Sequence, residues 1–150
     1  MAADRPLRRS NLIRTAAWGF ALNAVWEFTQ CVFLFDMWDW PFWKATLYMW
    51  TATLGDVGIV LGVVWIAGQL APRVVPPDVR GWAALLIVGF AASVALEWAA
   101  QVLGLWGYGP AMPTIDVAGH TVGLSPVAQV TLLPALSAWL SGRADGRASG

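Results

Sequence analysis

Three acidic side chains lie inside long apolar stretches of this chain. Glu27 lies in the run 12–35, and Asp56 and Glu97 lie in two later runs. An ionisable residue in a membrane-spanning helix costs roughly 2.5–3.5 kcal/mol on insertion scales, so its presence indicates a function. A carboxyl group can donate a proton to a reacting group or accept one from it. We therefore predict that Glu27, Glu97 and Asp56 are the catalytic residues.

The neighbours of the two glutamates favour a neutral carboxylic acid. Trp26 and Phe28 flank Glu27, and Trp98 follows Glu97. The two glutamates lie at a similar distance from the starts of their apolar runs, which predicts equal depth and a close approach. Burial and a nearby like charge both disfavour ionisation. The expected species is a proton shared by two carboxyl groups, or at least one neutral acid, which a general acid requires.

Each glutamate belongs to a stripe of small and polar residues. Residues three or four apart share one face of a helix, so both stripes are expected to face the interior of a helix bundle. The first stripe is Ala16, Gly19, Asn23, Glu27 and Gln30, and the second is Gly89, Ser93, Glu97 and Gln101. The candidate substrate-binding residues are Asn23, Trp26, Gln30, Trp98, Gln101, Tyr108, His120 and Gln129.

A structural role is the alternative for these polar residues. Side-chain hydrogen bonds hold membrane helices together, although each contributes only about 0.6 kcal/mol on average. This role is favoured for a single Asn or Gln, and for His120, which has no second ligand at metal spacing. It is disfavoured for the two glutamates, because glutamine would give the same packing at a lower insertion cost. No metal ion and no cofactor are expected.

The composition is typical of an integral membrane protein. Of the 150 residues, 58% are hydrophobic and 12% are charged, whereas soluble domains have roughly 45–50% and 25%. Four apolar segments reach the length of about 20 residues that a span needs: they are 12–35, 42–70, 81–105 and 124–140. We predict one all-α domain over 1–150, a bundle of four transmembrane helices with a flexible tail at 141–150. The matching stripes suggest two repeated helical hairpins.

The basic residues predict the orientation, because Lys and Arg favour the cytoplasmic side of a membrane. Only Lys44 falls on the opposite side from the other eight of the nine: Arg5, Arg8, Arg9, Arg14, Arg73, Arg80, Arg143 and Arg147. Both termini are therefore expected in the cytoplasm, and the protein in the cell inner membrane. The net charge of zero gives no reason to expect nucleic-acid binding. Cys31 is the only cysteine, so no intrachain disulfide can form.

A set of short motifs extends from the first apolar segment to the fourth. They are Trp26-Glu27-Phe28-Thr29-Gln30, Gly55-Asp56, Glu97-Trp98, Trp106-Gly107-Tyr108 with Met112-Pro113, and Gly123-Leu124-Ser125-Pro126 with Gln129 and Pro134. Together they resemble a family of small bacterial four-span membrane proteins of uncharacterised activity. This resemblance implies the four-span fold and no activity.

Two shorter motifs resemble families of known activity. The segment Asn-x-x-Trp-Glu-Phe that begins at Asn23 resembles membrane-bound terpene cyclases, in which the glutamate, here Glu27, is thought to protonate an epoxide or olefin. The segment 97–126 resembles lycopene-cyclase domains, with an acid, a Gly-x-Trp-x-aromatic pattern, a Gly-rich turn and a proline. The acidic pair that follows that proline in those domains is replaced here by Val127-Ala128-Gln129.

The expected function is an intramembrane enzyme that cyclises or isomerises an isoprenoid or another membrane lipid. Glu27 would be the general acid, with Glu97 or Asp56 as its partner. Such chemistry needs a dry acid and aromatic rings that stabilise a carbocation, and two of the eleven tryptophans, Trp26 and Trp98, adjoin the glutamates.

The alternative function is a proton-linked small carrier or an accessory subunit of a larger membrane complex. The partner would then be another membrane protein or a second copy of this chain. The structure should discriminate between these functions. An enzyme requires an apolar pocket that reaches Glu27 and opens sideways to the bilayer. A carrier requires polar access to Asp56 and Glu27 from opposite sides, and a subunit requires acids satisfied by their neighbours without a cavity.

Overall fold

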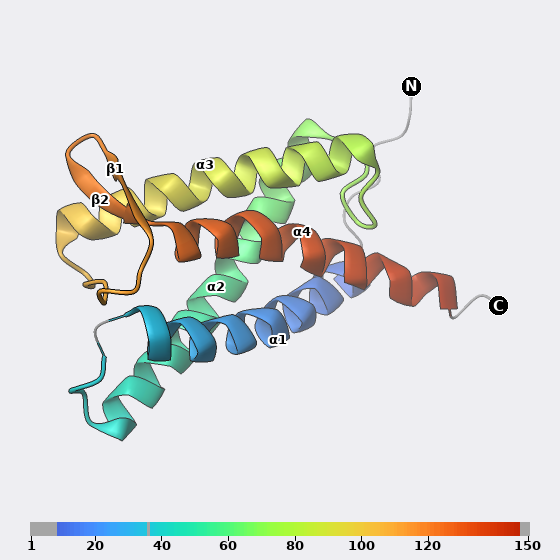
Figure 1. The fold of residues 1–150 in the computed structure, drawn as a ribbon. Helices are drawn as coiled ribbons and strands as arrows, with labels where there is room; N and C mark the ends of the chain where they lie inside the picture. The colour runs from blue at the N-terminus through green and yellow to red at the C-terminus, as the bar shows by residue number, and fades with distance from the viewer. Residues whose placement is uncertain (1–8, 36, 148–150) are drawn as a thin grey trace.

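The chain folds into four long helices and one short hairpin (Figure 1). The computed structural model describes residues 9–35 and 37–147, with side chains up to residue 143. The elements in order are α1 (Arg9–Leu34), α2 (Phe42–Leu70), α3 (Val79–Leu103), β1 (Thr114–Val117), β2 (His120–Gly123) and α4 (Leu124–Arg147). The expected helical bundle is confirmed, and each of the four apolar segments forms a helix.

Three of the helices are long and apolar enough to cross a membrane within the described part of the chain. They are α2, α3 and the segment Leu124–Arg143 of α4. Helix α1 has 26 residues, or about 39 Å at 1.5 Å per residue. It is less apolar than α2 and α3, and it carries Asn23, Glu27 and Gln30, all of which are buried.

The bundle has two apolar cores, one near each end. We call the end that carries β1, β2 and the α1–α2 connection the hairpin end; α1 begins and α4 ends at the opposite, terminal end (Figure 1). Near the terminal end α2 packs against α3 and α4, through residues that include Val64, Leu85 and Ala138. Near the hairpin end it packs against α1, where Met49 meets Cys31. Helix α2 therefore crosses the bundle from α1 to α3 (Figure 1).

Helices α3 and α4 approach each other closely at Gly89. A Cβ atom at this position would lie 2.6 Å from the carbonyl oxygen of Val130. Pro134, inside α4, has no N–H group and so cannot donate to that carbonyl in the usual helical way. A glycine is therefore required here because the two backbones touch.

The connection between α3 and α4 contains a β-hairpin. The glycines and prolines of this segment favour turns, but they did not predict the two strands. Strands β1 and β2 pair antiparallel, with Val117 opposite His120. Ala118 and Gly119 form the two-residue loop and both have positive φ, 50° and 80°, as two-residue hairpin loops commonly require. The ring of His120 packs edge-on against Trp98 of α3, with 5.7 Å between ring centroids.

The C-terminal segment differs from the expected flexible tail at 141–150. Helix α4 continues to Arg147, and the Ser141 hydroxyl donates to the carbonyl of Asn11 at 3.1 Å. Residue 142 is a glycine packed against Pro76, where a Cβ atom would lie 2.4 Å from that ring. The last residues of the expected tail, 148–150, and the basic residues Arg5 and Arg8 lie outside the described residues.

Candidate functional site

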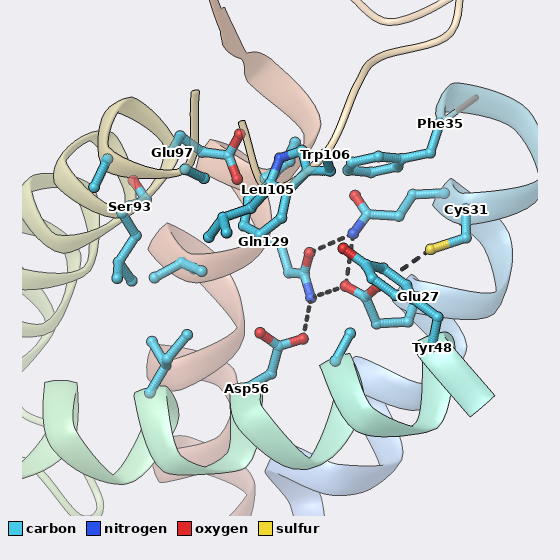
Figure 2. A pocket seen from close by; sticks show the side chains of 18 of the residues that line it. Glu27, Cys31, Phe35, Tyr48, Asp56, Ser93, Glu97, Leu105, Trp106 and Gln129 are labelled. Carbon is cyan, nitrogen blue, oxygen red and sulfur yellow. Dashed lines mark hydrogen bonds between the residues drawn. The ribbon is translucent and has the colours of Figure 1, made fainter. Parts of the chain in front are cut away.

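A cluster of polar side chains lies in the interior of the bundle, between α1, α2 and α4. We call Asn23, Glu27, Gln30, Asp56 and Gln129 the acid cluster. As the first stripe predicts, the α1 members point inward, and Glu27 is only 5% exposed. Asp56 of α2 and Gln129 of α4 extend toward Glu27 from two other helices, and Gln129 donates to both acids (Figure 2).

Gln129 is the hub of the acid cluster. Its amide nitrogen lies 2.9 Å from Asn23 Oδ1, 2.7 Å from Glu27 Oε1 and 2.8 Å from Asp56 Oδ2. An amide nitrogen has only two hydrogens, so three oxygens compete for two N–H bonds. The shared donor brings two carboxyl groups together, those of Glu27 and Asp56. Equal depth predicts that Glu27 also meets Glu97, directly or through one water, and this contact stays a prediction.

Gln30 orients the other side of Glu27. Its amide nitrogen donates to Glu27 Oε1 at 2.6 Å and to Gln129 Oε1 at 2.7 Å. Its oxygen accepts from the Trp26 indole at 3.0 Å and from the Ser125 hydroxyl at 2.9 Å. All hydrogen-bonding groups of Gln30 therefore have partners, which holds the Glu27 carboxyl in one orientation.

Cys31 completes the surroundings of Glu27. The thiol is one helical turn further along α1 and donates to Glu27 Oε2 at 3.3 Å. The side chain is buried and has no other polar partner among the described residues. Each oxygen of Glu27 thus has a donor: the two glutamines for Oε1 and the thiol for Oε2.

Glu97 belongs to a second polar group, on α3. It is 5% exposed and accepts a hydrogen bond from the Tyr108 hydroxyl, which in turn accepts from the backbone N–H of Gly123 at 3.0 Å. Burial, followed by the hydrogen bond to Glu97 and its charge, raises the pKa of Tyr108 to about 12. Tyr108 therefore stays protonated at neutral pH and acts as the donor. Gly123 is needed here because a Cβ atom would lie 2.9 Å from the Tyr108 ring.

The two polar groups lie on the wall of one cavity of about 320 Å³ (Figure 2). This volume is at the lower end of the range for small-molecule sites, roughly 300–1,000 Å³. Glu27, Gln30, Asp56 and Gln129 line it from α1, α2 and α4, and Glu97 lines it from α3. Most of the remaining lining is aliphatic or aromatic, and the cavity is partly open. The cavity therefore has carboxyl groups at two places on an otherwise mostly apolar wall: Glu27 with Asp56 at one, and Glu97 at the other.

The other predicted site residues lie beside the cavity rather than on its wall. Asn23 is in the acid cluster, and Trp26 holds Gln30. Trp98 packs against His120, and both lie outside the lining. The Gln101 amide donates to the carbonyl of Trp106 at 3.4 Å, and Tyr108 holds Glu97.

Sequence reasoning missed the aromatic side chains that do line the cavity, Phe35, Tyr48 and Trp106. Tyr48, Ala52, Asp56 and Ile59 all line it from α2. These residues are three or four apart and so share one face of α2. The spacing from Asp56 could therefore have indicated that Tyr48 lines the same site. Trp106 lies in an irregular connection, for which no periodicity gives a signal.

Comparison with protein-family models, with curated proteins and with solved structures gives no match for this chain. A function for this chain is therefore inferred from the chemistry of the site.

Proposed function

We propose that this protein is an intramembrane enzyme that isomerises or cyclises an apolar, isoprenoid-like lipid by protonation. The observation that carries the proposal is that the acid cluster forms part of the wall of an apolar cavity. A carboxylic acid beside such an apolar space can donate a proton to an electron-rich carbon or oxygen that enters it. Glu27 is the general acid, and Asp56 is the second carboxyl group, held beside it by the same Gln129 amide.

The proposed reaction begins with transfer of the Glu27 proton to a double-bond carbon or an epoxide oxygen of the lipid. A carbocation forms at the adjacent carbon, where attack by a second double bond closes a ring. Loss of a proton from a carbon next to the final cation, to the Glu97 carboxylate, restores a double bond. Glu97 then releases this proton to solvent and Glu27 takes one up, so both groups return to their starting states and the product is an isomer of the substrate. The rings of Phe35, Tyr48 and Trp106 stabilise the cation from the cavity wall.

The lining also favours an uncharged substrate. None of the described residues that line the cavity is Lys, Arg or His, whereas three are Asp or Glu. A phosphate or diphosphate group would face these carboxyl groups without a positive partner, and burying such a charge is unfavourable. A neutral polyene, epoxide or alcohol fits the cavity better.

The proposed reaction is tested by comparing lipid extracts of cells that express the protein with extracts of cells that do not. We expect an additional lipid of unchanged mass and shifted chromatographic retention, because the reaction is an isomerisation. In D2O the product should gain one deuteron, because the added proton comes from an exchangeable carboxyl group. Identical extracts from isoprenoid-producing cells, with and without the protein, would contradict the proposal.

We further propose that α1 is a fourth membrane span. Its polar residues face the interior, whereas its outward side chains are apolar, among them Ile13, Phe20, Val25 and Phe33. Lipid would therefore contact an apolar surface, although α1 is less apolar than α2 and α3. We also propose that both termini lie in the cytoplasm and that the membrane is the cell inner membrane, because Lys and Arg favour the cytoplasmic side.

The orientation predicts the result of cysteine labelling in intact cells, in a Cys31→Ala background. Thr121→Cys, in an exposed position of β2, should react with an impermeant reagent added outside. Ser149→Cys, at a position outside the described residues, should react only after the membrane is opened. Labelling of the second variant from outside would reverse the orientation.

The second candidate function is a proton-linked carrier or an accessory subunit. It is favoured by one observation: every carboxyl group of the acid cluster has hydrogen-bond partners within the bundle. Such a network can pass protons or fix the packing of helices. Catalysis at the cavity and this structural role predict different effects of Glu27→Gln: the first predicts loss of the product, and the second predicts none.

A further inference from the structure

Helices α2 and α3 diverge toward the hairpin end. Near the terminal end they share one core, in which Val63 and Ala67 of α2 belong to the same cluster as Ala84 and Leu85 of α3. Near the hairpin end Met49 of α2 instead clusters with Cys31 and Phe35. The cavity occupies the space between the two helices in this half, and both helices line it.

The terminal end of the bundle is closed by packing, and so is the part of the hairpin end beside α1. At the terminal end the core between α2, α3 and α4 is fully buried, with Val64, Ala67 and Leu85 at 0% exposure. At the hairpin end Phe35 pairs with Tyr108 through the backbone, and Met112 is buried beside them. A path for a large molecule through the terminal end is therefore blocked, whereas Leu105, just after α3, is exposed and lines the cavity.

On its side between α2 and α3, the cavity is bordered by residues that are exposed on the surface of the bundle. Its α3 wall includes Leu96 and Leu103, which are exposed on the surface of the bundle as well as lining the cavity. The α2 wall facing them includes the small side chain of Ala52, and Ala99 lies on the α3 wall. Both helices are apolar enough to span a membrane, so this rim lies where lipid chains would surround the protein.

We infer that an uncharged isoprenoid-like lipid enters the cavity sideways from the bilayer, through a portal between α2 and α3 that is bordered by Ala52, Leu96, Ala99 and Leu103. The inference rests on the proposed function and adds the route and the chemical class of the ligand. An apolar chain crosses an apolar rim without desolvation, whereas a charged group would lose its water before it met the carboxyl groups.

Cys31 supplies a native reporter for this route. It is the only cysteine of the chain, it lines the cavity, and it is only 3% exposed. The protein is placed in lipid nanodiscs, which expose both membrane faces to water. Phenylmercuric acetate, which partitions into lipid, is compared with the charged p-chloromercuribenzenesulfonate, and the mass of the intact protein reports the modification. Thr121→Cys in the Cys31→Ala background calibrates the reactivity of each reagent at an exposed thiol.

The expected result is that Cys31 reacts with the apolar reagent and is protected from the charged one, relative to the exposed thiol. Ala52→Phe, or Ala99→Phe from the opposite wall, should slow the apolar reaction by about tenfold or more, because a packed aromatic ring leaves no path for a molecule larger than water. Thr51→Phe is the matched control: it introduces the same side chain on the neighbouring, exposed position of α2, outside the lining. Its rate should be unchanged.

The ligand class is tested in the same nanodiscs. Geranylgeraniol, a neutral isoprenoid alcohol, should protect Cys31 from phenylmercuric acetate, whereas geranylgeranyl diphosphate should not. Equal protection by the diphosphate would refute the uncharged class. Rapid labelling by the charged reagent, or plug variants that fold normally and label at the normal rate, would refute the portal. These outcomes do not depend on proton transfer by Glu27, so failure of the portal and failure of the proposed reaction are distinguishable.

Discussion

Cells that express Glu27→Gln are expected to lack the additional isomeric lipid, although the variant folds normally. The amide oxygen can replace Oε1 and accept from Gln30 and Gln129, and its nitrogen takes the place of Oε2 beside the Cys31 sulfur. The amide cannot deliver a proton, however. General acids contribute roughly 10²- to 10⁴-fold to a rate, so the loss of product should be at least about 100-fold, as measured in lipid extracts of cells with equal protein levels.

Two further variants define the role of Glu27. Glu27→Asp keeps the acid but withdraws it by one methylene group from the reacting atom, so weak activity should remain. Asp39→Asn is the control, because Asp39 is an exposed acid in the connection between α1 and α2 and its loss should leave the product unchanged. A Glu27→Gln protein with normal thermal stability and normal product would remove the general-acid role and favour the subunit alternative.

Gln129→Leu is expected to cause the largest loss of stability among the cluster variants. It removes the donor shared by Asn23, Glu27 and Asp56 and the acceptor of Gln30. A buried acceptor left without a donor costs roughly 1–3 kcal/mol, and more when it is charged. We therefore expect the free energy of unfolding to fall by about 2–4 kcal/mol, well above the average of about 0.6 kcal/mol for one hydrogen bond between membrane helices.

Thermal unfolding of the purified protein in detergent measures this loss. The matched control is Gln69→Leu, because the exposed Gln69 amide donates only within α2, to the carbonyl of Trp65 at 3.3 Å. That change should leave the unfolding temperature nearly unchanged. If Gln129→Leu unfolds at the same temperature as Gln69→Leu, Gln129 is not the hub on which the acid cluster depends.

The sequence by itself determined the four helices and the inward direction of the glutamates. Apolar runs longer than a bilayer span leave few alternatives to helices, and a polar stripe at intervals of three and four residues defines one face of each helix. Asn23, Glu27 and Gln30 are buried for this reason. Neither feature depends on how the helices pack against one another.

The partner of Glu27 was decided only by the tertiary structure. Equal depth along α1 and α3 favoured Glu97, but α2 crosses the bundle (Figure 1) and brings Asp56 to Gln129 (Figure 2). Glu97 instead accepts a hydrogen bond from Tyr108. Spacing along a helix determines which face a residue occupies, but not the tilt of the helix or the neighbour that it meets. The cavity depends on the same tilt, because it lies where α2 leaves α3. Its aromatic lining at Trp106 comes from an irregular connection, whose path is determined by contacts with α1 and α3 rather than by any local pattern.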